Sequence, residues 1–168
     1  AVIHYTTNGQ DPSESDPVVN SGSSVVVRRS LVLKARAWKS GWTPSGIKSA
    51  SFRITGAIKV CVFDDQDLNG SLNNGEQLSG WPIHISGVGI SRDVVTASDG
   101  YVTISGLDEG EYTVTQPVGV LDSRGNFSHG GKRYHAFDGL AKTASVVPGQ
   151  TTNMSFRNVC LGAIQATV

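Results

Sequence analysis

The sequence predicts an all-β fold organised as β-sandwich modules. Val, Ile and Thr account for 41 of the 168 residues, whereas Leu and Met together account for only 10. Branched side chains favour strands, and the 20 glycines and 20 serines favour turns. Turn pairs such as Asn8-Gly9, Asn69-Gly70 and Asp99-Gly100 separate short apolar runs along the whole chain. This spacing is typical of a sandwich and excludes a helical bundle, a coiled coil and most α/β enzymes.

The first four expected strands lie before residue 56, and each is a run rich in branched or apolar residues between turn signals. Leu31–Trp38 shows the clearest alternation, with apolar side chains at every second position from Leu31 to Ala37. The four runs are Val2–Thr7, Ser24–Val27, Leu31–Trp38 and Ile47–Ile54.

Seven further strands are expected after residue 56, again between glycine, asparagine and aspartate turns. The longest irregular stretch, 122–140, is expected to hold a hairpin that turns at its Gly-Gly pair. The seven runs are Ala57–Phe63, Ile83–Ser86, Val94–Ala97, Tyr101–Ile104, Gly110–Gln116, Ala141–Val147 and Thr151–Leu161.

The charge distribution places a domain boundary at Thr55-Gly56-Ala57. The formal net charge of the chain is zero, but residues 1–56 hold 7 basic and 3 acidic residues, whereas residues 57–168 hold 7 basic and 11 acidic ones. We therefore expect two domains, 1–56 and 57–168. The neutral total does not suggest a nucleic-acid partner, and no apolar run is long enough to insert into a membrane.

A twelve-residue stretch after the first strand of the second domain has the spacing of a calcium loop. Counted from Asp65, the oxygen-bearing side chains stand at positions 1, 3, 5, 7, 9 and 12, and glycine stands at position 6, where the loop turns sharply. The expected ligands are Asp65, Asp67, Asn69, Ser71, Asn73 and Glu76, with Asp64 as a possible addition. Strand-like flanks indicate an EF-hand type of loop on a β scaffold, and we expect the calcium to be structural. The alternative is an acidic surface turn that binds no ion.

The first domain resembles the small C-terminal β-sandwich of chitobiases and β-hexosaminidases. The resemblance rests on His4-Tyr5-Thr6-Thr7-Asn8-Gly9-Gln10-Asp11-Pro12, on Leu31–Trp38, and on Ser40-Gly41-Trp42 with Ser45. It implies a non-catalytic Ig-like appendage of a secreted or surface protein. Family members have one or two strands before the first motif, so this module is expected to be an incomplete sandwich. Either other domains of a longer chain or a neighbouring copy, by β-strand complementation, would complete it.

Trp38 and Trp42 have two interpretations. Packing inside the module or at an interface is the one that we favour, and a stacking platform for a sugar is the other. The second would make the domain a carbohydrate-binding accessory module of a secreted glycosidase, with a polysaccharide as its ligand.

The second domain resembles the B-type repeats of serine-aspartate repeat adhesins. The resemblance rests on Val62-Phe63-Asp64-Asp65 with the loop, on Gly75 to Ile83, on Thr96-Ala97-Ser98-Asp99-Gly100-Tyr101, and on Gly106 to Val114. It implies a prealbumin-like Greek-key β-sandwich that binds calcium and serves as a spacer or stalk. Related collagen-adhesin domains carry a Lys–Asn isopeptide bond promoted by a Glu. Lys59 and Asn158 suggest it here, but Gln116 stands where the acid is expected and Lys59 is out of register, so we expect no such bond.

Cys61 and Cys160 lie on the expected first and last strands of the second domain. They have no CxxC or zinc-ligand spacing, which leaves two free thiols or one long-range disulfide. We expect the disulfide, which would clamp the domain.

These observations predict a non-catalytic extracellular or cell-surface structural module, stiffened by calcium and a disulfide, that acts as a spacer, stalk or filament subunit. The alternatives are the carbohydrate-binding module and an adhesin that binds a host or cell-surface ligand. The sequence contains no G-x-S-x-G, H-E-x-x-H or P-loop motif, and we expect no enzymatic activity.

Overall fold

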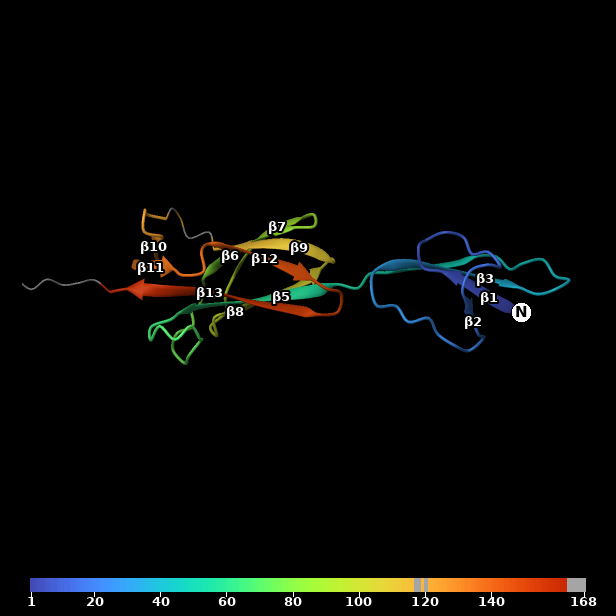
Figure 1. The fold of residues 1–168 in the computed structure, drawn as a ribbon, viewed down its shortest axis with the longest axis horizontal. Coiled ribbons are helices and arrows are strands. Elements are labelled where there is room, and N and C mark those ends of the chain that lie inside the picture. The colour runs from blue at the N-terminus through green and yellow to red at the C-terminus, as the bar shows by residue number, and fades with distance from the viewer. Residues whose placement is uncertain (117–118, 120, 163–168) are drawn as a thin grey trace, which may run out of the picture. The chain divides into compact units, whose positions relative to one another are not determined.

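The structure is a computed structural model that describes residues 1–116, 119 and 121–162. The chain divides into two compact units, Ala1–Thr55 and Gly56–Val168, called unit 1 and unit 2 below, and the division falls one residue before the expected boundary. All thirteen elements within the described residues are β-strands (Figure 1), which confirms the predicted all-β class. Among the described residues, no helix is long and apolar enough to cross a membrane.

Unit 1 is one four-stranded antiparallel sheet with the strand order β2-β1-β3-β4. Residues 1–55 thus form a single layer, whereas a sandwich has two packed layers. The run Ser24–Val27 was expected to be a strand but has no ladder partner, and Val18–Val19 pairs with β1 instead. The four strands are β1 (Val2–Thr6), β2 (Val18–Val19), β3 (Leu31–Trp38) and β4 (Lys48–Phe52).

The two faces of the unit 1 sheet differ in chemistry. Register and the two-residue period place nine apolar side chains and Lys48 on one face. The loop of residues 7–17 covers the other face, where His4 and Thr6 are buried and contact the carbonyls of Asp16 and Gln10. None of the nine apolar side chains is buried within residues 1–55. They are Ile3, Tyr5, Val19, Leu31, Leu33, Ala35, Ala37, Ala50 and Phe52.

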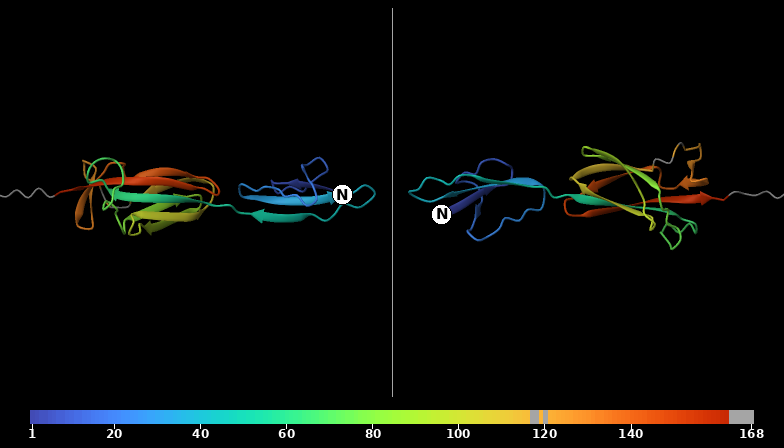
Figure 2. Two further views of the ribbon diagram at one scale, coloured as in Figure 1. Left: turned by 90° about the horizontal axis from the view of Figure 1, so that it is seen from below. Right: turned by 180° about the vertical axis from the view of Figure 1, so that it is seen from behind.

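Unit 2 is a β-sandwich of two sheets, which Figure 2 shows as two layers of strands. One sheet has the order β10-β11-β13-β5-β8 and the other the order β12-β9-β6-β7. The strands are β5 (Gly56–Asp64), β6 (Pro82–Gly87), β7 (Ile90–Val95), β8 (Tyr101–Leu107), β9 (Gly110–Thr115), β10 (Asn126–His129), β11 (Lys132–Ala136), β12 (Ala141–Val146) and β13 (Thr151–Leu161).

The expected hairpin in residues 122–140 is present. Strands β10 and β11 pair around Gly130 and Gly131, which both have positive φ, as a tight hairpin turn requires. The strand expected at Val94–Ala97 lies earlier, at Ile90–Val95, where it pairs with β6 through a two-residue turn after Gly87. Gly87 has a φ of 144°, and a Cβ there would lie 2.6 Å from the carbonyl oxygen of Glu111, so only glycine fits that position.

The hydrophobic core that the described residues form lies between the two sheets of unit 2. Ile58, Val60 and Val62 of β5 point into it together with side chains from the opposite sheet. Strand β13 runs parallel to β5, with Thr152 opposite Ile58 and Asn158 opposite Asp64. The parallel pairing matters for function because it carries β13 alongside the end of β5, where the acidic loop begins.

A small polar network is buried in this core. The indole Nε1 of Trp81 donates to the side-chain oxygen of Gln116 at 2.8 Å, and the Asn158 amide donates to the same oxygen at 2.9 Å. Trp81, Gln116 and Asn158 are at most 2% exposed. Lys59 lies on the other face of β5, with its ammonium 4.2 Å from the ring centre of Tyr101. Asn158 and Lys59 thus lie on opposite faces of the sheet, and the amide of Asn158 bonds with Gln116 instead.

Candidate calcium site

The acidic loop is closed at its base by hydrogen bonds to neighbouring strands. The backbone amide of Asp64 donates to the carbonyl of Glu76 at 2.8 Å, which brings the two ends of the loop together. The amide of Asp65 donates to the carbonyl of Asn158 at 2.8 Å, which fixes the start of the loop to β13. The twelve-residue segment is therefore held by the rigid end of the sandwich.

Three of the expected ligands converge. One carboxylate oxygen each from Asp65, Asp67 and Glu76 lies within 4.8 Å of the others. Calcium–oxygen distances are about 2.3–2.6 Å, so two oxygens on one ion are separated by at most about 5 Å. The spacing of the three carboxylates therefore fits a single calcium ion. Asp65 and Glu76 are buried, whereas Asp67 is exposed.

Backbone amides of the loop orient these carboxylates. The two oxygens of Asp65 accept hydrogen bonds from the amides of Asn69 and Gly70, both at 3.0 Å. The two oxygens of Glu76 accept from the amides of Gln66 at 2.9 Å and Asn73 at 2.8 Å. Gly70 has a φ of 77°, in the left-handed region that the sharp turn at position 6 requires. The loop thus aims the acidic side chains at its own interior.

The amide side chains of the loop gather on Asp67. The Nδ2 groups of Asn69 and Asn73 both donate to Asp67 Oδ2 at 2.8 Å, and Asn69 Oδ1 accepts from the amide of Ser71 at 2.7 Å. The side chains of Asn69 and Asn73 therefore contact Asp67, and Ser71 is joined to Asn69 through its backbone amide. In this arrangement the Nδ2 group of each amide, rather than its oxygen, faces the carboxylate of Asp67.

Arg157 is a charged neighbour that the loop spacing does not reveal. Its Nε forms an ion pair with Asp65 Oδ2, and its guanidinium carbon lies 4.4 Å from the ring centre of Phe137. Burial raises the pKa of Asp65, but the amide of Gly70 and the guanidinium of Arg157 outweigh it and hold the pKa below its usual value. Arg157 comes from β13, and no sequence signal places it beside a loop more than 80 residues earlier.

Asp64 lies outside the group of three converging carboxylates. Its Oδ1 accepts a hydrogen bond from the amide of Cys160 at 2.7 Å, and its Oδ2 accepts one from the Gln66 side chain at 3.4 Å. Asp64 is the last residue of β5, whereas Asp65 is the first residue of the loop. The carboxylate of Asp64 is thus bonded to β13 and secures the base of the loop.

The expected disulfide is not formed, since Cys61 and Cys160 are both free. In the register of β5 with β13, Cys61 lies opposite Ser155, and Cys160 lies five positions further along. Five residues span about 16 Å, whereas bridged cysteines have Cα atoms within about 7 Å of each other. The odd offset also places the two thiols on opposite faces of the sheet. Adjacent strands bring two cysteines together only where the register also places them opposite each other on one face.

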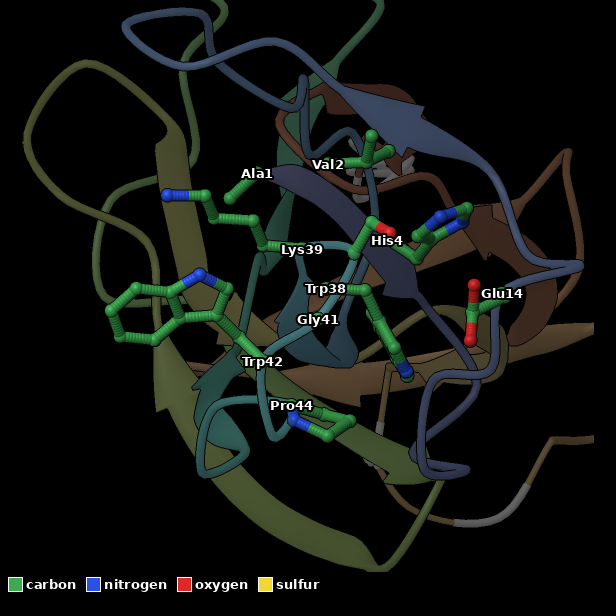
Figure 3. A pocket seen from close by; sticks show the side chains of 10 residues that line it. Ala1, Val2, His4, Glu14, Trp38, Lys39, Gly41, Trp42 and Pro44 are labelled. Carbon is green, nitrogen blue, oxygen red and sulfur yellow. The ribbon is translucent and has the colours of Figure 1, made fainter.

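Trp38 and Trp42 line one pocket of unit 1 rather than filling a core (Figure 3). Trp42 is 70% exposed, and Trp38 is half-buried at the end of β3. Trp42 is therefore not packed inside unit 1, whereas its packing at an interface stays a prediction.

No protein-family model matches this chain, and no curated protein matches it in sequence. Among solved structures, the Bacillus anthracis TIE protein aligns with 95% of this chain and 34% of its own, with a TM-score of 0.55 and 12% identity. GBS52, the minor pilin of Streptococcus agalactiae, aligns with 82% of this chain and 63% of its own, with a TM-score of 0.42 and 12% identity. BcpA, the major pilin subunit of Bacillus cereus, aligns with 80% and 40%, with a TM-score of 0.40 and 15% identity.

The likeness to the Bacillus anthracis protein shows a shared all-β fold and nothing more, since the sequence identity is only 12%. The chain spans about a third of that protein's length. Nothing in the comparisons supports the resemblance of residues 1–55 to the chitobiase domain.

Proposed function

We propose that this chain is a non-catalytic structural module of an extracellular surface protein, in which calcium stiffens unit 2. The observation that carries the proposal is the convergence of Asp65, Asp67 and Glu76 within 4.8 Å in a loop of the predicted spacing. The all-β fold shared with the Bacillus anthracis protein supports a structural role. The resemblance of unit 2 to the B-type repeats of adhesins suggests the surface of a cell.

A bound calcium ion would cross-link elements that meet at this end of the sandwich. Asp65 follows β5 and is bonded to β13, whereas Glu76 closes the loop onto β5. Without a cation, three carboxylates face one another with Arg157 as the nearby positive charge. Like charges at such distances repel, so the ion would lower the energy of the closed loop. The Asn69 and Asn73 amides would rotate by half a turn to offer oxygen.

The test is the thermal unfolding of unit 2 with and without calcium. Extracellular calcium modules bind with a Kd of about 10⁻⁴ to 10⁻³ M. At about 10 mM calcium, such an affinity stabilises the folded state by about 1.4 to 2.7 kcal/mol. For a unit of this size, that is a rise in Tm of about 6 to 11 °C.

The matched variants are Glu76→Gln, which removes a converging carboxylate, and Glu109→Gln, which removes an exposed one from a turn far from the loop in sequence. Glu76→Gln is expected to abolish the calcium-dependent rise in Tm, and Glu109→Gln to retain it. An equal rise in both variants, or none in the original chain, would contradict the proposal.

The proposed partners are further domains of a longer chain or neighbouring copies that complete unit 1 by β-strand addition. Strand β4 supports this, because it is at the edge of its sheet and all five of its residues are exposed. The segment Gly162–Val168, which follows β13 in the sequence, is a candidate donor, but residues 163–168 lie outside the described residues. Electron microscopy and light scattering at rising protein concentration would distinguish filaments from monomers.

A further inference from the structure

We propose that Asn74 is a site of spontaneous conversion to isoaspartate, and that this conversion opens the turn that positions Glu76. The pair Asn74-Gly75 lies in the green loop that follows β5 (Figure 1). The modification and the opening of the turn are independent of the calcium proposal, whereas their effect on calcium binding rests on it. The inference adds a slow covalent change of the backbone to the structural role proposed above.

The chemistry needs only the chain and water. The backbone nitrogen of Gly75 attacks the side-chain carbonyl carbon of Asn74, and the new C–N bond closes a succinimide ring. The side-chain nitrogen leaves as ammonia and takes the proton of the Gly75 amide with it. Water then opens the ring at one of its two carbonyl groups and gives either aspartate or isoaspartate. Glycine favours the attack, because it has no Cβ to hinder the approach of its nitrogen.

The chain has three Asn-Gly pairs, which begin at Asn8, Asn69 and Asn74. The backbone nitrogen after Asn8 donates to the carbonyl of Val32 at 3.2 Å, and the one after Asn69 donates to Asp65 Oδ2 at 3.0 Å. The side-chain oxygens of Asn8 and Asn69 also accept from the amide two residues further on, at 3.0 and 2.7 Å. In both pairs the attacking nitrogen and the attacked side chain are therefore held by other groups.

Asn74 is the least restrained of the three. It is exposed, and within the described residues its side chain has no hydrogen-bond partner. The nitrogen of Gly75 donates to the side-chain oxygen of Gln77 at 2.9 Å. A half-buried side chain such as Gln77 can rotate away, unlike the backbone carbonyl of Val32 or the buried carboxylate of Asp65. The structure thus selects Asn74 for ring closure.

The turn around Asn74 sets the position of Glu76. The amide of Glu76 donates to the carbonyl of Asn73 at 3.3 Å, and the Glu76 carboxylate accepts from the Asn73 amide at 2.8 Å. Isoaspartate leads the backbone through the former side chain, which lengthens it by one carbon atom between these two residues. A four-residue turn that both bonds close has no slack for an extra atom. The conversion therefore moves Glu76 out of the spacing that a calcium loop requires.

The first experiment follows the three Asn-Gly pairs of the full chain, which are matched sites in one molecule. The chain is aged in chelator at mildly alkaline pH, folded and in urea, and the peptides are mapped by mass spectrometry and by isoaspartyl methyltransferase. In the folded chain, Asn74 is expected to convert about tenfold or more faster than Asn8 and Asn69, and in urea the three rates are expected to agree within about threefold. Equal rates in the folded chain, or no conversion of Asn74, would overturn the proposal.

The second experiment measures hydrogen exchange at the Asn73 and Glu76 amides in chelator, and then the calcium-dependent rise in Tm. The aged chain is expected to exchange both amides faster and to lose the rise in Tm in proportion to its isoaspartate content. Aged Asn74→Gln is expected to keep both properties of the fresh chain. Fresh Asn74→Asp is also expected to keep them, because it adds the charge without the extra backbone atom.

Unchanged exchange of the Glu76 amide in isoaspartate-rich chain would overturn the opening of the turn. Loss of the rise in fresh Asn74→Asp would also count against it, because the added charge alone would then explain the effect. The absence of a rise in the fresh original chain would contradict the calcium proposal alone, since the exchange measurement still decides whether the turn opens.

Discussion

Replacing Gln116 by leucine should destabilise unit 2 more than any exposed substitution. Gln116 is 1% exposed, and its side-chain oxygen accepts from Trp81 Nε1 at 2.8 Å and from Asn158 Nδ2 at 2.9 Å. Its Nε2 donates to the Gly139 carbonyl at 3.3 Å and to Asn158 Oδ1 at 3.4 Å. Leucine fills a similar volume but leaves the indole N–H and the Asn158 amide without partners.

Each buried donor left without a partner costs about 1–3 kcal/mol. The free-energy cost of two such donors is partly offset by the gain from burying an apolar side chain in place of an amide. The net loss of stability is about 2–4 kcal/mol. For a unit of this size, the expected fall in Tm is about 8–17 °C.

The assay is urea unfolding of Gln116→Leu, Asn158→Leu and the double variant, followed by circular dichroism. Gln150→Leu is the matched control, because Gln150 is exposed and its change should stay within about 0.5 kcal/mol. The double variant is expected to cost less than the sum of the single ones, since each leaves the other amide unpaired. Additive losses, or a loss below about 1 kcal/mol for Gln116→Leu, would refute the role assigned to this network.

Three further expectations concern charges and thiols of unit 2. In the presence of a chelator, Arg157→Met should lower the Tm of unit 2, because Asp65 loses its ion-pair partner. The same variant should bind calcium more tightly in calorimetry, because a competing cation is removed. Backbone hydrogen bonds from Asn126 and Arg124 hold the pKa of Asp122 well below its usual value, so its contribution to stability is present above the unfolded pKa and is lost as pH falls through the folded pKa. Asp122→Asn should therefore flatten the acid side of the Tm–pH curve, and an unchanged curve would contradict this. A thiol reagent should detect two free thiols in denaturant without reductant. In the native state Cys160 should react first, because Cys61 is buried and burial raises its pKa. A mass two daltons low would indicate an oxidised pair and contradict this.

Local chemistry explains why the loop could be read from the sequence. The positions of Asp65, Asp67 and Glu76 are fixed by a twelve-residue spacing, and Gly70 supplies the left-handed turn that the spacing requires. Interactions within so short a segment depend little on the rest of the chain. The strand predicted at Ser24–Val27 is absent, because strand formation depends on distant residues: a run of valines becomes a strand only where the edge of a sheet is available to pair with it.

Turn chemistry and side-chain branching act over a few residues, so the all-β class, most of the strands and the spacing of the acidic loop follow from local sequence. Which distant residues meet depends on the packing of the whole sandwich. The register of β5 with β13 places Arg157 beside Asp65 and sets Cys61 and Cys160 on opposite faces. That register is chosen by the packing of the whole core, and a shift of one residue would turn every side chain of a strand to the other face.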